Sequence, residues 1–376
     1  MKIALIGPSK LRYMPYMKHY LDMLEGSGCA VHVVYWDRDG KPDEKWDSDA
    51  VFHPFREDMD DGWPHRKKAI PFLGFRRHVV RVLKETGCDK VVFFQTVTGL
   101  CVADLLVGRY SENYIYDYRD VGWTYKVPLF RRMTAKLVAH SAITFVSSDG
   151  YRDYLPPNGN IARIHNVDGR QLRESLGWKR ERAGVRGGVC KVAFWGNVRN
   201  GAINDDALAA FAADERFEFH FYGAVTETKY LDRVERLLSG SKRENVFFHG
   251  PYSADERQGF AEESDLLWNC YYFGKGSYNP AVSNKYYDGL VFRIPQIVFS
   301  NSFSGREVTE KGLGISIDPS SDGFLDEIYD YWKSVDMERF DEVAEAEARS
   351  LCSEVSDARR RIVEFASSQV LPDVRG

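Results

Sequence analysis

Short apolar runs alternate with amphipathic stretches through most of this chain. Residues 2–7 form an apolar run that ends at Gly7, residues 13–25 carry a helical pattern, and residues 30–36 are apolar again. A strand, a glycine turn, a helix and a second strand form a βαβ unit, which predicts a parallel sheet with a right-handed crossover. Ligands of such sheets bind outside the carboxyl ends of the strands.

The alternation continues in two series. In the first series we predict helices over residues 73–86 and 127–140, and strands over residues 90–94, 114–118, 142–147 and 161–165. In the second we predict strands over residues 190–195, 217–222, 246–249, 265–269 and 295–299, and helices over residues 205–213, 227–238, 254–263 and 285–291. The charged, glycine-containing stretch 169–188 is a predicted linker, and residues 324–370 are predicted to be helical.

This rhythm predicts an α/β protein with two doubly wound, Rossmann-like domains. The domains are expected at residues 1–180 and 189–350, followed by a C-terminal helix, residues 351–376, that we expect to return to the first domain. A length of 376 residues fits two domains of roughly 100–200 residues each.

Composition and charge narrow the class of protein. The net charge of −4 gives no global basic field for nucleic acid. The six cysteines are scattered without a C-x-x-C pair, which argues against a zinc site or a disulfide framework. No apolar run approaches the roughly 18 residues of a membrane span, and no secretory segment opens the sequence. These features predict a cytoplasmic protein.

Residues 283–298 carry the most specific chemistry. Ser283 and Asn284 precede a short helical pattern in which Lys285 and Asp288 lie three residues apart, on one face. The start of a helix offers free N–H groups and the positive end of the helix dipole. A cation, an acid and such an anion site would suit a sugar nucleotide. The alternative is a solvated surface ion pair behind an ordinary helix cap.

Several segments together resemble the GT-B glycosyltransferases, in particular the bacterial group that builds capsule, exopolysaccharide and O-antigen. Residues 285–288 and 295–298 are similar to the family's K-x-x-E donor signature and the proline turn and strand that follow it. The other matching segments are residues 164–168, 192–199, 219–223 and 245–252. The resemblance follows the order of elements over nearly the whole chain.

The resemblance implies two facing Rossmann-like domains and a metal-independent transfer of a sugar from a nucleotide diphosphate, with no cofactor. In this family cationic side chains and helix ends stabilise the departing phosphate. The residues that would bind the donor are Gly196, Asn197, Arg199, Gly223, Tyr252, Ser283, Asn284, Lys285 and Asp288. Arg199 and Lys285 would take the catalytic part, and Asp288 would hold ribose or sugar hydroxyls.

Four positions depart from the family pattern. Asp288 stands where the family usually has Glu, and Pro280 stands where a second Glu is common. Arg293 replaces a glycine before the signature proline, and Val167 replaces the glycine expected after Asn166. The donor sugar and its nucleotide are therefore left open, while the resemblance favours a hexosyl group and retention at the anomeric carbon.

The acceptor side is predicted in the first domain. Asp117, Arg119 and Asp120 lie at the carboxyl end of a predicted strand. There Asp120 could orient or deprotonate an acceptor hydroxyl, and Arg119 could contact a carrier phosphate. Gly7 and Ser9 would line the same place. The alternative is a salt-bridged loop with a tight first turn.

The D-x-D motif of Asp37 and Asp39 follows a strand and precedes Gly40. We interpret it as the end of the strand, and no other residue cluster predicts a metal site.

One segment is strongly basic. From Arg66 to Lys84 the chain carries seven Arg and Lys residues, apolar residues between them and no acid; a second basic stretch runs over residues 126–136. Such segments can lie on an anionic membrane, here the inner face of the cytoplasmic membrane. The alternative is a half-buried helix with a solvated basic face.

The sequence thus predicts a glycosyltransferase that adds a sugar to a saccharide or lipid-linked saccharide of a cell-surface polysaccharide. A sugar-nucleotide epimerase of the same architecture and a non-catalytic glycosyltransferase-like subunit stay open as alternatives.

Overall fold

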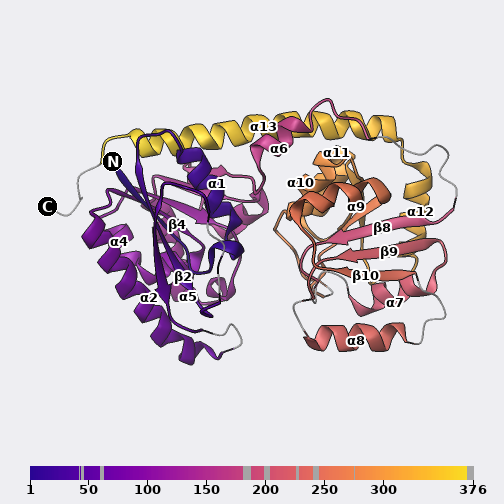
Figure 1. Ribbon diagram of the computed structural model, residues 1–376, viewed down its shortest axis with the longest axis horizontal. Helices are drawn as coiled ribbons and strands as arrows, with labels where there is room; N and C mark the ends of the chain where they lie inside the picture. The colour runs from indigo at the N-terminus through magenta and orange to yellow at the C-terminus, as the bar shows by residue number, and fades with distance from the viewer. Residues whose placement is uncertain are drawn as a thin grey trace. The chain divides into compact units, whose positions relative to one another are not determined.

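Two parallel β-sheets, one in each half of the chain, organise this protein, whose structure is a computed structural model (Figure 1). The structure describes residues 1–41, 43, 46–59, 63–180, 188–198, 204–225, 228–239, 245–274 and 276–370. The chain divides into a first unit of Met1–Asn166 and Glu354–Gly376, and a second unit of Val167–Ser353. The predicted α/β class with two doubly wound sheets is confirmed.

The first unit contains a seven-stranded sheet in the order β3-β2-β1-β4-β5-β6-β7. Its strands are β1 Lys2–Ile6, β2 Ala30–Asp37, β3 Val51–Arg56, β4 Lys90–Phe94, β5 Tyr114–Tyr118, β6 Ile143–Val146 and β7 Ile161–Arg163. Its helices are η1 Leu11–Tyr13, α1 Pro15–Leu24, α2 His65–Thr86, α3 Thr96–Cys101, α4 Ala103–Val107, η2 Trp123–Lys126, α5 Pro128–Ala139 and η3 Asp149–Tyr154. All neighbouring strands pair in parallel.

The second unit contains a six-stranded parallel sheet in the order β10-β9-β8-β11-β12-β13. Its strands are β8 Cys190–Trp195, β9 Phe217–Tyr222, β10 Val246–Gly250, β11 Leu266–Asn269, β12 Gln296–Phe299 and β13 Gly314–Ile317. Its helices are α6 Gly169–Glu174, α7 Asp205–Ala213, α8 Thr228–Leu238, η4 Ala254–Glu256, α9 Arg257–Glu263, α10 Asn284–Val291, α11 Phe303–Lys311 and α12 Phe324–Ser334. Phe194, Phe211, Phe219 and Trp268 lie in its core, which fixes the strands beneath the site described below.

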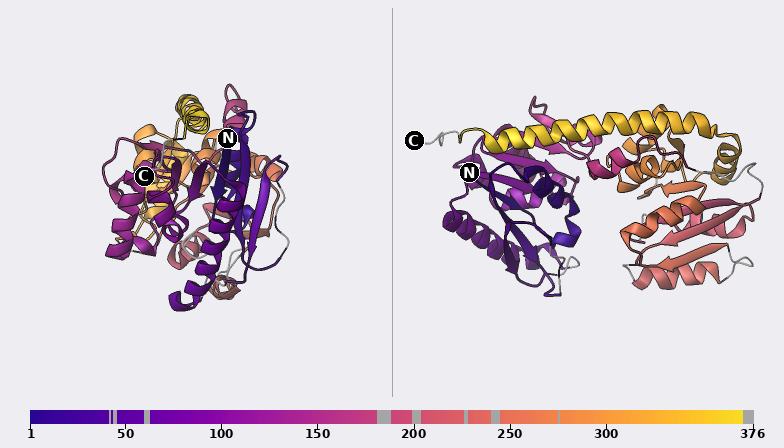
Figure 2. Two further views of the ribbon diagram at one scale, coloured as in Figure 1. Left: turned by 90° about the vertical axis from the view of Figure 1, so that its left-hand side faces the viewer. Right: turned by 45° about the horizontal axis from the view of Figure 1, so that its top comes forward.

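Helix α13, Met337–Ser367, begins in the second unit and ends in the first, and Figure 2 shows it as one continuous helix. In the first unit the buried Lys90 Nζ donates to the Ser368 carbonyl at 2.8 Å and to the Phe365 carbonyl. An ammonium group at the end of a helix satisfies carbonyls that have no partner within the helix.

Three sequence predictions need correction. Helix α2 begins at His65, not at residue 73, because the helix continues through Pro71, whose ring already holds φ near the helical value. The predicted linker contains α6, whose first turn is capped by the Asp168 side chain accepting from Arg170 N at 2.8 Å. The predicted helical tail is interrupted at Val335, between α12 and α13.

Strand β3 was not predicted from the sequence. It carries Pro54, which argues against a central strand, but β3 lies at the edge of its sheet and pairs only with β2. The sequence also gave no clear pattern for α3, α4, α11 and β13. No helix among the described residues has the length and apolar character needed to cross a membrane.

Candidate functional site

In the second unit, glycine loops follow two adjacent strands. Gly196, after β8, has a φ of 136° and Gly223, after β9, a φ of 144°. A Cβ atom on Gly223 would lie 1.8 Å from the carbonyl oxygen of Gly196, so no other residue fits there without a shift of backbone. The two loops are joined further by Val198 N donating to Ala224 O at 3.0 Å. The close contact with the Gly196 backbone therefore explains why residue 223 is a glycine.

Lys285 is buried beside this loop, near the start of α10. Its Nζ donates to the Tyr271 hydroxyl at 2.8 Å and lies 4.1 Å from the centre of the Phe194 ring. A Cβ atom on Gly196 would lie 3.3 Å from the same Nζ. Lys285 is only 4% exposed, and the structure records no ion pair for it among the described residues. Among the described residues the ammonium therefore has a ring face and a hydroxyl as neighbours, and no carboxylate lies at bonding distance to balance its charge.

Asp288 does not form the surface pair with Lys285 that was one reading of their spacing. Its Oδ2 accepts from Trp195 Nε1 at 2.7 Å, and its Oδ1 accepts from Arg257 Nη1 at 2.9 Å. Burial raises the pKa of this carboxyl, although Arg257, Trp195 and Lys285 each act to lower it. Asp288 thus ties α10 to the end of β8 and to α9.

A buried polar network positions the start of α10. Ser283 Oγ accepts from Lys285 N at 3.2 Å and donates to Asn269 Oδ1. Asn269 Nδ2 donates to Gln296 Oε1 at 2.9 Å, and Gln296 Nε2 donates to the Tyr286 carbonyl at 3.1 Å. The last residue of β11 and the first residue of β12 therefore fix the cap that holds Lys285 in place.

The other residues predicted on the donor side lie around this centre. Asn197 and Asn284 are exposed, next to Gly196 and at the first position of α10. Tyr252 is half-buried and packs edge-on against Phe260 at 5.4 Å between ring centres. Burial and the charge of Asp288 raise its pKa. Arg199 lies outside the described residues.

Two residues of this site were missed by the sequence analysis. Arg257 and Tyr271 reach Asp288 and Lys285 from 31 and 14 positions away. Tyr271 lies two residues after the end of the predicted strand 265–269, which places it at the carboxyl edge of the sheet. Arg257 gave no such signal, because it begins a helix on the surface.

In the first unit, the predicted acceptor-side residues lie at the carboxyl ends of β1 and β5. The buried Asp117 accepts two hydrogen bonds from Arg119, Nε to Oδ1 at 2.7 Å and Nη2 to Oδ2 at 2.8 Å. The Arg119 guanidinium carbon lies 4.3 Å from the centre of the Tyr16 ring. This matches the salt-bridged alternative for the pair.

Asp120 differs from Asp117, because the residue is exposed and no bonding partner is recorded for it in the described part of the chain. Desolvation nevertheless raises the pKa of its carboxyl.

Gly7 and Ser9 lie near η1 and α1. A Cβ atom on Gly7 would lie 2.4 Å from Met14 Sδ and 2.7 Å from Met17 Cε, so packing of these methionines accounts for the glycine. Ser9 is half-buried.

The D-x-D motif is occupied by a side chain of the protein itself. The buried Lys10 Nζ lies 3.1 Å from Asp37 Oδ1, forms a second ion pair with Asp39, and donates to the Lys41 carbonyl at 2.7 Å. The described residues contain no group of three or more His, Cys, Asp or Glu side chains placed to hold a metal ion.

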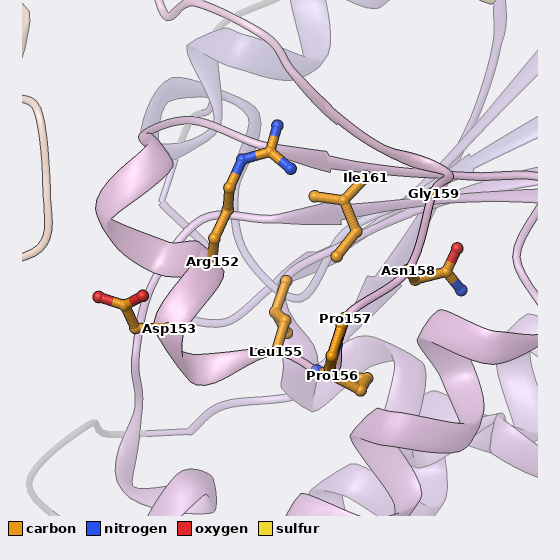
Figure 3. A pocket seen from close by; sticks show the side chains of 8 residues that line it. All are labelled: Arg152, Asp153, Leu155, Pro156, Pro157, Asn158, Gly159 and Ile161. Carbon is orange, nitrogen blue, oxygen red and sulfur yellow. The ribbon is translucent and has the colours of Figure 1, made fainter.

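A shallow pocket lies elsewhere in the first unit, between η3 and β7. Figure 3 shows Leu155 and Ile161 turned toward it and Asp153 turned away. Arg152 Nε donates to Asp149 Oδ1 at 2.6 Å, and Asn158 Nδ2 donates to Val138 O at 3.3 Å. Because these polar groups are bonded within the protein, the pocket offers little for recognition, and it contains none of the predicted site residues.

A scan against protein-family models found no match, and a search of the curated proteins found none either. Solved structures do match along the whole chain. A sucrose-phosphate synthase from Thermosynechococcus elongatus aligns with a TM-score of 0.70 at 14% identity, covering 98% of this chain and 100% of that one. The lipopolysaccharide outer core galactosyltransferase WaaB aligns with a TM-score of 0.66 at 12% identity, covering 96% and 99%.

HepE from Anabaena, solved in complex with UDP-glucose, aligns with a TM-score of 0.65 at 13% identity, covering 98% of this chain and 100% of that one. At these identities the likeness shows the fold alone. The chain therefore has the GT-B fold, an α/β architecture of two parallel sheets.

Proposed function

We propose that this protein is a metal-independent glycosyltransferase that moves a hexosyl group from a nucleotide diphosphate sugar to a saccharide or lipid-linked saccharide. The observation that carries the proposal is the buried Lys285 ammonium beside Gly196, without an ion pair among the described residues. A buried charge is costly unless an opposite charge accompanies it, and a diphosphate would supply that charge.

The donor would bind to the second unit. Lys285 and the N–H groups at the start of α10 would contact the diphosphate, and Gly196 leaves space for it beside the ammonium. As the bond between the anomeric carbon and the diphosphate breaks, negative charge grows on the leaving oxygen. A fixed ammonium in a buried position stabilises that charge more than it stabilises the intact donor.

The acceptor would bind to the first unit through Asp120. Its carboxylate would accept a hydrogen bond from the acceptor hydroxyl, and its raised pKa makes it a better base than an ordinary aspartate. As the hydroxyl oxygen bonds to the anomeric carbon, the bond to the diphosphate breaks and the nucleoside diphosphate leaves as an anion. The hydroxyl proton passes to the Asp120 carboxylate, which releases it to water. Cell-surface polysaccharide is the proposed process, and it rests on the sequence resemblance.

A thermal-shift panel of UDP, GDP, TDP and CMP with their sugar conjugates tests this function. A ligand at 100 times its Kd stabilises the folded state by about 2.7 kcal/mol, which is roughly 5–10 °C for a unit of this size. We expect a shift with one diphosphate family. Lys285→Met should lose that shift while the ligand-free protein melts at the same or a higher temperature, because a buried unpaired charge has been removed.

Lys191→Met is the matched control, since Lys191 is an exposed lysine of the same unit. It should keep the shift. If no nucleotide shifts the wild type, the donor site is contradicted and a non-catalytic subunit is favoured. A shift followed by sugar interconversion without any acceptor would favour the epimerase.

We also propose that the first unit rests on an anionic membrane through α2. Ile70 and Leu73 are 73% and 53% exposed, and Arg77, Arg81 and Lys84 continue the same stripe at helical spacing. Arg76 is not part of this surface, because its guanidinium donates to both carboxylate oxygens of Asp104 at 2.7 and 2.8 Å. Arg66 belongs to α2, and its side chain lies outside the described part of the structure. The protein would then be cytoplasmic and peripheral.

Co-sedimentation with vesicles tests this contact. Each basic residue near an anionic surface contributes about 1 kcal/mol, so neutralising Arg77, Arg81 and Lys84 together should weaken binding to phosphatidylglycerol vesicles on the order of a hundredfold. Neutralising Arg339, Arg349 and Arg360, three exposed arginines of α13, is the control. Equal losses in both triple variants, or equal binding to neutral phosphatidylcholine vesicles, would contradict a specific role for α2.

A further inference from the structure

Gln95 has a backbone conformation that side chains other than glycine rarely adopt. It follows β4 directly, with a φ of 65° and a ψ of 147°. The left-handed helical well that asparagine and similar residues visit has a ψ of about 30–60°, so Gln95 lies outside it, close to the region used almost only by glycine. Such strained residues persist where the surroundings hold them and are common at binding sites.

The position of Gln95 in the sheet is a second, independent observation. Strands β1 and β4 are neighbours, with Ile6 paired to Phe93, and the order of the sheet runs to β2 and β3 on one side and to β5 on the other. The carboxyl edge between β1 and β4 is therefore the topological switch point of this sheet. Ligands of open α/β sheets bind in the crevice at that point.

Hydrogen bonds from Gln95 to neighbouring groups hold the residue in place but do not involve its side-chain oxygen, Oε1. Gln95 N donates to Asp117 O at 3.0 Å, and Gln95 Nε2 donates to the Tyr16 hydroxyl at 2.9 Å. The Arg119 guanidinium carbon lies 4.3 Å from the centre of the same Tyr16 ring. Gln95 is half-buried, and within the described residues no partner is recorded for its Oε1.

A second unused polar atom belongs to the same group. Arg119 Nη1 is buried and has no hydrogen-bond partner in the described structure, although Nε and Nη2 are bound to Asp117. An amide carbonyl and a guanidinium N–H thus offer an acceptor and a donor of hydrogen bonds around one tyrosine ring. A hydroxyl group both donates and accepts, so a polyhydroxylated ligand fits this pair.

We propose that Gln95 binds the acceptor saccharide, with its Oε1 accepting a hydrogen bond from an acceptor hydroxyl at the switch point of the first unit. This inference rests on the glycosyltransferase proposed above and adds a specificity-determining residue to it. The strained backbone places the amide at the switch point, where bonds to Tyr16 and Asp117 hold it. The chemistry named here is that of a sugar hydroxyl, whether the sugar is free or carried on a lipid.

The variants Gln95→Ala and Gln95→Gly separate strain from recognition. Alanine removes the amide but keeps a Cβ atom at positive φ, whereas glycine removes both. At an ordinary position alanine is the more stable of the two. We expect the opposite order here, with the Tm of Gln95→Gly higher than that of Gln95→Ala by several degrees.

Transfer is measured with the nucleotide sugar that gives the largest thermal shift and a panel of p-nitrophenyl glycosides as acceptors. Both variants should lower kcat/KM for the acceptor at least tenfold, mainly through KM, and both should keep the wild-type thermal shift with nucleotide. The matched control is the pair Glu112→Ala and Glu112→Gly. Glu112 is an exposed residue with a φ of 61° at the turn before β5, so this pair should show the same order of Tm without loss of transfer.

The outcomes distinguish this inference from the function beneath it. If the wild type binds no nucleotide, the proposed function fails and the acceptor role of Gln95 fails with it. If the wild type binds nucleotide and the Gln95 variants transfer with an unchanged acceptor KM, only the role of Gln95 is overturned. If nucleotide binds but no glycoside in the panel is accepted by the wild type, the assignment of Gln95 to saccharide binding is likewise overturned.

Discussion

Asp288 shows how a single side chain can serve two purposes that the sequence does not separate. Its carboxylate joins the indole of Trp195 to the guanidinium of Arg257, and it lies one helical turn from the ammonium of Lys285. The bonds to Trp195 and Arg257 stabilise the second unit. The position near Lys285 would instead place an acid beside a bound sugar. The two purposes make different predictions for stability and for ligand binding.

Asp288→Asn keeps the shape of the side chain but removes its charge and one of its two accepting oxygens. Loss of a buried hydrogen bond to a charged group should lower the free energy of unfolding by about 1–3 kcal/mol. Urea denaturation of Asp288→Asn, Arg257→Met and the double variant measures this, and the coupling between the two sites should be about 0.5–3 kcal/mol. Wild-type stability together with a lost nucleotide shift would instead assign Asp288 to the donor alone.

For single residues, the sequence could indicate candidate side chains but not the groups to which they bond. The predicted helix over residues 285–291 agrees with α10, and both Lys285 and Asp288 are buried in it. The bonds these residues form could not be predicted, because Trp195, Arg257 and Tyr271 reach them through the folding of separate strands and helices. Arg293 illustrates the same limit, since it replaces the expected glycine yet adopts a φ of 52°, with Nη2 donating to Ser175 O at 2.9 Å.

Among the elements, the second half of α13 is joined to β7 by charge. Glu354 Oε2 accepts from Arg163 Nε at 2.8 Å and lies 3.1 Å from His165 Nε2. Burial acts to raise the pKa of Glu354, but the bonds from His165 and Arg163 outweigh it and bring the pKa to about 2. The ordinary value is 4.5, so folding favours the ionised form.

Because the folded-state pKa is depressed, this contribution to stability is fully present above about pH 4.5 and is lost as the pH falls toward about 2. We expect the denaturation midpoint of the wild type to fall more steeply across this window than that of Glu354→Gln, which cannot titrate. Fluorescence-monitored urea unfolding at a series of pH values measures both slopes. Parallel curves for the two proteins would show that Glu354 does not supply the difference.

Strands and helices with a regular hydrophobic pattern were predicted well, whereas those interrupted by a proline were not. Strands β1, β8 and β9 are continuous apolar or alternating runs that each end at a glycine, and their predicted bounds agree with the structure to within a residue. Strand β3 and the first turns of α2 were lost because each contains a proline, and only the surrounding fold makes those prolines acceptable.

For the whole molecule, the alternation of strands and helices was enough to predict two parallel sheets, because a parallel connection requires a crossover and the chain supplies one after nearly every strand. The strand order, and with it the switch point between β1 and β4, could not be predicted. The strand order depends on the edge of the sheet to which each crossover connection adds the next strand. No local sequence pattern indicates which edge that is. Gln95 could therefore not be recognised from the sequence.

The division of the chain also sets an order of events during synthesis. The second unit is one continuous segment, Val167–Ser353, whereas the first unit takes its last part from Glu354 onward. On the ribosome the second unit can complete its core before the chain is finished. The first unit emerges earlier but can cover the surface beneath α13 only after the end of that helix has emerged. Until then the ammonium of Lys90 has no helix end to bind, and the nascent first unit exposes the surface that α13 will cover.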